Sequence, residues 1–464
     1  MSKKIIYLLS LLMALSLVFA SCKKNAGPTA PGGDGPNNEE DEIKNNTGGL
    51  IDSWENLKDK TIINDYAVVN ETGGDYYRNP VIVALGGGNV LIITEKRIDF
   101  PGSANDIGVN GEKPVDLVYL LSTDGGDNFD AAKVIGTSSV GDATKAVSAP
   151  VVYYQRPSAG DTGKIYIIAS AGAGISRTSQ NYSDRNPKSQ LKYIVGNINS
   201  LTGKATVSFT DWKDLVVTSA SDINGKQFGT HSGRGVYKDA STLILPIITA
   251  DQGANSPGTP KEMMGVVFYE VSGANGDNLT IGAKIGQVTS FNAGTPNFSV
   301  YKEAKAVEWD GSKVVYLAVP NPTGGNGKIG KGDSSTANNV TSTTIPGSEG
   351  SFGFLKLTKG WYGAGEYNPQ QYTTQNNGKD EILFSHVITP AGENHMRLLD
   401  ATQYQPQTKS LRIAKTGKSS SIDVLPDGTI IVAAEKERNT AASGLKFNIF
   451  FSRYTQSYLS SQLE

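Results

Sequence analysis

Three histidines and one cysteine are the side chains of this chain that most readily bind metal ions or act as nucleophiles. His231, His386 and His395 form no metal-ligand spacing with one another, with the cysteine or with carboxylates. We therefore interpret all three as structural or surface residues. Cys22 is the only cysteine, which excludes an internal disulfide. The sequence thus predicts neither a metal site nor a cofactor.

Nucleotide binding is equally unsupported. Gly86, Gly87 and Gly88 would cradle a phosphate at the start of a helix, but no helical pattern follows them, so a hairpin turn is the better interpretation. The chain carries 43 Lys and Arg against 45 Asp and Glu, a formal net charge of −2. This balance does not suggest a nucleic-acid partner.

The stretch from Ser122 to Phe129 reads S-x-D-x-G-x-x-F, the pattern of an Asp-box. In such a box an Asp side chain accepts backbone N–H groups of its own turn, and Gly supplies positive φ angles. The Phe is expected to fold back over the hairpin as a plug. The box is therefore interpreted as a structural turn between two strands, and among all-β folds it favours a propeller over a sandwich.

The elements around the box are short apolar or alternating runs separated by Gly, Asn, Asp and Pro, which predicts an all-β fold. Two stretches interrupt this rhythm, at 155–192 and 321–351. For the second, its Gly, Ser, Thr and Asn content favours disorder. Degenerate boxes are expected at Ser272–Leu279, Leu357–Trp361 and Leu399–Tyr404.

The N-terminus reads as a targeting segment. Lys3 and Lys4 precede an apolar stretch, Ile5–Phe19, and Ala20-Ser21-Cys22 resembles a relaxed bacterial lipobox. We predict a signal peptide over 1–21, lipidation of Cys22, a flexible tether over 22–50 and a folded domain over 51–464. This implies a lipid-anchored protein of the bacterial cell envelope, on the outer-membrane surface or in the periplasm.

Six segments, in the correct order, resemble the sialidase and trans-sialidase family. They are Tyr77-Arg78-Asn79-Pro80 with its strand, the strand ending Glu95-Lys96-Arg97, the Asp-box, Gly229–Pro246, Glu303–Gly311 and Ser419–Glu435. The resemblance implies a six-bladed β-propeller of the sialidase type. It also implies an exo-α-sialidase, which releases terminal sialic acid from glycoconjugates at the centre of one face.

The resemblance assigns roles residue by residue. Arg78 matches the first of three arginines that bind the sugar carboxylate, for which a planar guanidinium is suited. Glu303 matches the Glu that activates a Tyr nucleophile, a nucleophile that avoids repulsion by the substrate carboxylate. Asp106 is the better candidate for the general acid and base, with Asp99 as competitor. Arg97 and Arg234 are expected at the site rim.

Other positions depart from the family pattern. Ser419 occupies the position where Tyr is expected, and Val319 occupies that of the second arginine. Arg397 serves as the third only if the alignment slips by several residues. Tyr404 and Tyr301 are the nearest alternatives for the missing nucleophile.

Three functions therefore remain open from the sequence. The first is a membrane-tethered, monomeric sialidase acting on sialylated glycans. The second is a propeller without catalysis that binds glycans as a lectin or adhesin. The third is a glycosidase of other sugar specificity, since the loss of two arginines removes the reason to prefer an acidic sugar. The fold alone does not choose between them.

Overall fold

The computed structural model describes residues 63–454 with gaps, together with Leu459; the longest gaps are 99–113, 175–187, 251–263, 289–300, 333–342, 358–380, 401–408 and 439–445. The predicted signal peptide, Cys22 and the tether lie outside the described residues. Within the described part, no helix has the length and apolar character needed to span a membrane.

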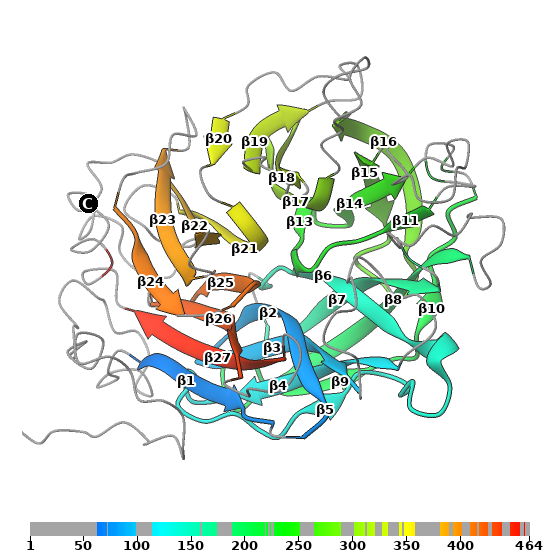
Figure 1. Cartoon of the computed structure of the whole chain (residues 1–464). Helices are drawn as coiled ribbons and strands as arrows, with labels where there is room; N and C mark the ends of the chain where they lie inside the picture. Colours follow the sequence, from blue (N-terminus) through cyan, green and yellow to red (C-terminus); the bar gives the residue numbers. More distant parts are fainter. Residues whose placement is uncertain are drawn as a thin grey trace, which may run out of the picture.

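Six sheets stand as blades around a common axis (Figure 1), and all their strand pairs are antiparallel except the short parallel pair of β6 and β12 (Gly233–Arg234). Blade 1 holds β2 (Tyr76–Gly86), β3 (Asn89–Arg97), β4 (Val115–Ser122) and β5 (Lys133–Val134). Blade 2 holds β6 (Val147–Tyr154), β7 (Thr162–Gly172), β8 (Ser189–Asn199), β9 (Thr206–Phe209) and β10 (Lys213–Asp214). Blade 3 holds β11 (Gln227–Gly229), β13 (Val236–Asp239), β14 (Thr242–Ala250), β15 (Met264–Ser272) and β16 (Thr280–Val288).

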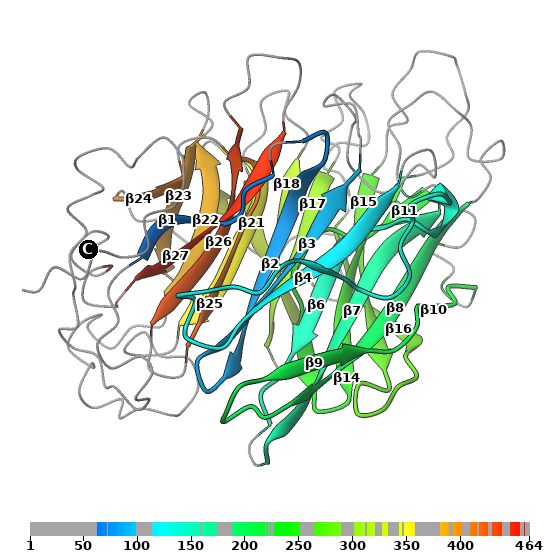
Figure 2. The same ribbon diagram turned by 90° about the horizontal axis from the view of Figure 1, so that it is seen from below.

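Blades 4 to 6 complete the ring, which Figure 2 shows from the side. Blade 4 holds β17 (Tyr301–Asp310), β18 (Lys313–Pro320), β19 (Gly327–Gly332) and β20 (Thr343–Ile345). Blade 5 holds β21 (Ser348–Leu357), β22 (Glu381–Ile388), β23 (Glu393–Asp400) and β24 (Leu411–Ala414). Blade 6 holds β25 (Ser420–Val424), β26 (Ile430–Glu437), β27 (Phe447–Tyr454) and β1 (Ile63–Val69). A 3₁₀ turn at Ala143–Lys145 precedes β6.

The ring closes through blade 6, because β1 from the start of the fold pairs antiparallel with β27 from its end. Each blade is covered by a neighbour on both faces, so its inner strands are buried on both sides; every residue of β6, the innermost strand of blade 2, is buried. The apolar clusters accordingly lie between blades: one joins blades 1 and 2, and another joins blades 1 and 6. This packing confirms the all-β propeller prediction.

The Asp-box forms the turn after β4 and docks onto blade 6. Ser122 Oγ donates to Asp124 Oδ1 (2.7 Å), and Asp124 Oδ1 accepts the backbone N–H of Asn128 (3.0 Å). Phe129 packs edge-on against Phe451 of β27, with 5.3 Å between ring centroids. Arg453, also on β27, donates from Nη1 to the carbonyl oxygen of Gly125 (2.6 Å). The box is thus structural, and its Phe caps the contact with the neighbouring blade.

The strands and turns also bear on two predictions from the sequence, the degenerate Asp-boxes and the disorder of residues 321–351. The degenerate box at Ser272–Leu279 falls on the turn between β15 and β16, where Gly273 has a φ of +94°; the other two boxes extend outside the described residues. The expected disorder of 321–351 is wrong in part, because β19 and β20 lie there and pair with each other. Backbone pairing to β18 and to each other holds β19 and β20 in the blade, and a polar or Gly-rich sequence can form such backbone hydrogen bonds.

Candidate functional site

The Asp-box and the start of β2, which contains Arg78, lie on opposite faces of the ring. In blade 1 the register pairs Tyr76 with Arg97 at one end of the sheet and Gly86 with Asn89 at the other. The Asp-box lies at the second end, where Gly125 N–H donates to the carbonyl oxygen of Gly88 (2.8 Å). We call the opposite face, where β2 begins, the Arg78 face.

Arg78 is held on this face by blade 6. Its Nε donates to Oε1 of Glu435 on β26 at 2.8 Å. The Arg78 side chain is 11% exposed and that of Glu435 is fully buried. The guanidinium also lies over the ring of Phe447, 4.8 Å from its centroid. A charge-assisted bond and an aromatic face therefore fix the direction of the cation before any ligand binds.

Asn79, which follows Arg78 in the chain, makes hydrogen bonds to Glu435, Glu95 and Ser419. It has a φ of 55°, a left-handed conformation that Asn tolerates better than most residues. Its backbone N–H donates to Glu435 Oε1 (2.7 Å), and its Nδ2 donates to Glu95 Oε1 (3.0 Å). Its Oδ1 accepts the hydroxyl of Ser419 (2.9 Å). Asn79 therefore links blades 1 and 6 directly below the candidate carboxylate-binding arginine.

Glu95, on β3, is fully buried and accepts four hydrogen bonds. Besides Asn79, the donors are the backbone N–H of Ala149 at the start of β6 (2.7 Å) and Nε and Nη2 of Arg97 (2.9 and 2.5 Å). Arg97 is itself only 3% exposed. Arg97 was expected at the site rim. The structure instead places it in a buried ion pair with Glu95, and the same carboxylate accepts the hydrogen bond from Asn79.

The contacts of Glu95 and Glu435 recur, among the described residues, at a third junction between blades. In each case a side chain near the end of a blade's second strand accepts a backbone N–H from a residue of the next blade that lies in its innermost strand or directly after the first part of that strand. Ser170 of β7 repeats the contact by accepting the N–H of Thr230 (2.8 Å). A related side-chain bond joins Ser385 of β22 to Ser420 of β25 (2.7 Å). We call these contacts the inter-blade clasps.

The inter-blade clasps were not predicted from the sequence, although a sequence pattern marks two of them. The second strands of blades 1 and 6 both end with a Glu-Lys pair and one more residue, Glu95-Lys96-Arg97 in β3 and Glu435-Lys436-Glu437 in β26. The partner residues, Asn79 and Ala149, both precede a proline and both have positive φ. A search for Glu-Lys strand ends paired with X-Pro strand starts would have found two of the clasps.

Ser419, at the expected nucleophile position, lies within this network. It is 2% exposed, and its carbonyl oxygen accepts the N–H of Glu435 (2.9 Å). Its hydroxyl donates to the Asn79 amide oxygen, an acceptor that cannot remove a proton. Ser419 thus contacts Asn79, the residue that follows Arg78 in β2, and its hydroxyl is engaged in this hydrogen bond.

Tyr77 is the described tyrosine nearest to Arg78 in the chain. Burial raises the pKa of its phenol, which keeps the hydroxyl protonated. Its ring belongs to the apolar cluster between blades 1 and 6. Tyr404 and the side chain of Tyr301, the alternatives considered for the nucleophile, lie outside the described residues.

Arg234 and Arg397, which were predicted to belong to the same site as Arg78, have other neighbours in the described residues. Arg234 approaches the carbonyl oxygen of Tyr154 at 3.4 Å and Asp423 at 3.6 Å, and Asp423 accepts the N–H of Ala84 near the far end of β2. Arg234 thus lies towards the Asp-box face. Arg397 lies on β23, the third strand of blade 5, opposite Phe384. The described contacts do not bring Arg397 to Arg78.

The two predicted catalytic carboxylates are described only in part. Asp106 and its competitor Asp99 lie outside the described residues, as does the side chain of Glu303. The backbone of Glu303 is in β17, near the Arg78 face, and its register partner is Val319. Val319 therefore stands opposite Glu303, where the alignment expects an arginine. Within the described residues there is no group of three or more metal-ligating side chains.

His386 and His395 lie opposite each other on neighbouring strands of blade 5. His386 is 1% exposed and stacks on Phe384. Burial, with a smaller effect from the positive charge of Arg397, lowers the pKa of His386 to about 3. His395 Nε2 contacts Glu393 Oε2 at 3.1 Å, and Glu393 also pairs with Arg412. Both histidines are part of the packing of blade 5.

The fold has solved counterparts, although no protein-family model and no curated protein matches the sequence. A Hadza microbial sialidase matches with a TM-score of 0.54 at 15% identity, over 82% of this chain and 66% of its own. A leech intramolecular trans-sialidase, in complex with 2,7-anhydro-Neu5Ac, matches with a TM-score of 0.53 at 13% identity, over 87% and 71%. A Dyadobacter fermentans protein of unknown function matches with a TM-score of 0.54 at 12% identity, over 84% and 98%.

This chain thus spans just under two thirds of the Hadza sialidase. At such identities the likeness concerns the fold alone. The protein is an all-β, six-bladed propeller of the sialidase type.

Proposed function

We propose that the protein acts on the terminal sialic acids of glycoconjugates and that Arg78 binds the sugar carboxylate. One observation carries this proposal: Arg78 is held at the start of the innermost strand of blade 1 by the buried Glu435 and by Phe447. A guanidinium held in place by a buried carboxylate loses little freedom on binding, which favours recognition of a planar anion.

In the catalytic form of the proposal, Glu303 activates a nucleophile and Asp106 is the general acid and base. The signal peptide, the lipidated Cys22 and the tether would hold the propeller at the bacterial envelope, where glycoconjugates are accessible. These roles rest on the sequence resemblance.

A second function, glycan binding without hydrolysis, is favoured by Ser419. Its hydroxyl is buried and bonded to Asn79 at the position where the family places its nucleophile. A propeller with Arg78 in place and no nucleophile would retain the sugar rather than cleave it. The two functions share the same carboxylate site and differ in turnover.

The test uses a fluorogenic sialoside and the Arg78→Lys variant. Lysine keeps the charge but lacks the planar fork, so the loss of a charge-assisted bond is expected to lower kcat/KM about 10- to 100-fold, or about 1.5–3 kcal/mol. Arg412→Lys, on the outermost strand of blade 5, is the matched control and is expected to retain wild-type activity.

The same pair of variants separates the alternatives. Turnover that falls only in Arg78→Lys supports the sialidase. Binding without turnover, lost only in Arg78→Lys, supports the lectin. Equal activity or binding in both variants would overturn the role of Arg78, and activity on neutral glycosides alone would point to another sugar specificity.

A further inference from the structure

The chain passes from blade 6 to blade 1 through a short connection. β1, the outermost strand of blade 6, ends at Val69, and β2, the innermost strand of blade 1, begins at Tyr76. We call residues 70–75 the closing segment, of which 70, 71 and 73–75 belong to the described part. The closing segment leads directly into the strand start that carries Arg78.

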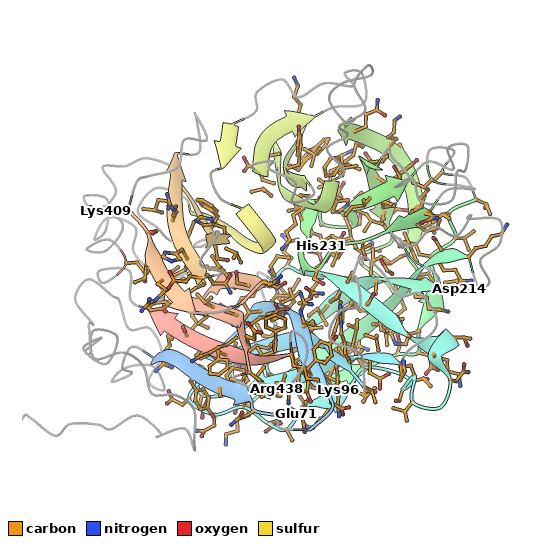
Figure 3. All side chains as sticks on the ribbon, in the orientation of Figure 1. Glu71, Lys96, Asp214, His231, Lys409 and Arg438 are labelled. Carbon is orange, nitrogen blue, oxygen red and sulfur yellow. The ribbon has the colours of Figure 1, made fainter. Side chains whose placement is uncertain are left out.

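Arg438 holds the backbone of the closing segment. It lies directly after β26, and its Nη1 donates to the carbonyl oxygens of Glu71 and Gly73, the latter at 3.2 Å. Its Nη2 donates to the carbonyl oxygen of Asp75 (2.8 Å). Figure 3 shows Arg438 and Glu71 next to each other, with Lys96 of β3 close by. One guanidinium therefore binds three carbonyl groups, for which a planar fork of N–H donors is better suited than a lysine ammonium.

Two residues at the start of β27 add bonds to the same segment. Lys446 donates from Nζ to the carbonyl oxygen of Gly74 (3.1 Å). Asn448 accepts the backbone N–H of Glu71 at Oδ1 (3.2 Å) and donates from Nδ2 to Oδ1 of Asn70 (3.0 Å). The end of the β26–β27 hairpin therefore holds the closing segment along its described length.

The same hairpin end also fixes the Arg78 guanidinium. Glu435 of β26 accepts the Nε–H of Arg78 (2.8 Å), and Phe447 of β27 presents its ring to the cation. Beyond the last pair of the ladder, the backbone N–H of Arg438 donates to the carbonyl oxygen of Lys446 (2.8 Å), which ties the two strand ends together. The backbone before Arg78 and the Arg78 side chain are thus held by one hairpin.

Blade 1 holds the closing segment from its other side. The Asp75 carboxylate pairs with Lys96 of β3 at 3.0 Å. Burial lowers the pKa of Arg438, and the negative charges of Glu71 and Asp75 oppose this effect. A guanidinium keeps its charge in proteins, so its bonds to the carbonyl oxygens are charge-assisted. Asp75 is therefore bound by a cation of each blade, at its backbone by Arg438 and at its side chain by Lys96.

We infer that Arg438 is a positioning residue for the sugar carboxylate: by holding the closing segment, it fixes the start of β2 and with it the place of Arg78. This inference rests on the proposed carboxylate site. Arg438 acts through the backbone of the segment and through the hairpin that it shares with Glu435. Without its bonds the strand start gains freedom that binding must remove, which weakens the affinity. By linkage, the bound sugar in turn restricts the closing segment.

The experiment compares N-acetylneuraminic acid with its methyl ester by calorimetric titration at pH 5.5. The ratio of the two affinities isolates the carboxylate contact, and a loss of stability alone leaves this ratio unchanged while the protein is folded. Arg438→Gln is expected to bind the acid about 2- to 10-fold more weakly, with the affinity for the ester unchanged. Arg438→Lys, which keeps a charged donor, is expected to lie between the wild type and Arg438→Gln.

Lys213→Gln is the matched control. Lys213 of blade 2 also donates to the backbone of a neighbouring blade, at the carbonyl oxygen of Asp277 (2.9 Å) in the turn between β15 and β16. This contact joins blades 2 and 3 rather than blades 6 and 1. The variant is therefore expected to keep the wild-type ratio of affinities.

The outcomes separate the two proposals. Equal affinity of the wild type for acid and ester overturns the carboxylate site and, with it, the role of Arg438. A wild type that prefers the acid, with the same preference in Arg438→Gln, overturns the role of Arg438 and leaves the Arg78 site standing. If Arg438→Gln does not fold, hydrogen exchange of the wild type decides: the backbone N–H groups of residues 71 and 73–75 are expected to exchange more slowly when the acid is added, and unchanged rates overturn the inference.

Discussion

Replacing Glu95 with alanine is expected to lower the free energy of unfolding by about 3–5 kcal/mol, the cost of breaking a buried ion pair from one side. Glu95 is fully buried and accepts bonds from Arg97, Asn79 and Ala149. Its removal leaves the Arg97 guanidinium, 3% exposed, without this partner and opens the clasp between blades 1 and 2. Chemical denaturation of wild type and variant measures the loss.

Asp130→Ala is the matched control for this prediction. Asp130 also pairs with a cation, Lys133, but the two side chains are 59% and 55% exposed. Exposed pairs contribute about 0–1 kcal/mol, so little change is expected. A loss in Glu95→Ala as small as that in Asp130→Ala would show that the buried network does not stabilise the ring.

The second large effect is expected for Gly126→Ala in the Asp-box. Gly126 has a φ of +94°, and an added Cβ would lie 2.2 Å from Cζ of Phe451 in blade 6. The left-handed backbone costs about 1–2 kcal/mol for an L-residue, and overpacking adds about 1–3 kcal/mol. The free energy of unfolding should therefore fall by about 2–5 kcal/mol.

Gly141→Ala separates the two causes. Gly141 has a similar φ of +83°, but nothing lies within 4 Å of its added Cβ. This variant is expected to lose only the backbone contribution of about 1–2 kcal/mol. The difference between the variants measures the contact between the Asp-box and blade 6, and equal losses would contradict the docking role of the box.

Local patterns predicted much of the fold. The apolar runs at 81–85, 90–94 and 115–121 fall within β2, β3 and β4, because strand formation and turn chemistry are largely local. The Asp-box was recognisable for the same reason. The pairing of Gly233–Arg234 with β6 of blade 2 and the third strand of blade 4, β19, were not predicted. β19 is held by backbone pairing to β18, which leaves little trace in side-chain type.

The site was predicted less completely, since its contacts depend on ring closure. Arg78 and Ser419 remain predicted site residues, and the structure connects them through Asn79, which is 340 residues from Ser419 in the chain. The roles of Glu95 and Glu435 as clasps were missed, because each acts on the next blade rather than on its own strand. Arg97 was expected at the site rim, whereas the structure buries its side chain in an ion pair with Glu95.

The most direct test of the account compares N-acetylneuraminic acid with its methyl ester, which has the same sugar without the negative charge. Calorimetric titration at pH 5.5 is expected to show binding of the acid and at least about tenfold weaker binding of the ester, since a charged hydrogen bond contributes about 1.5–3 kcal/mol. Equal affinity for acid and ester, or binding of neither, would contradict a carboxylate site at Arg78.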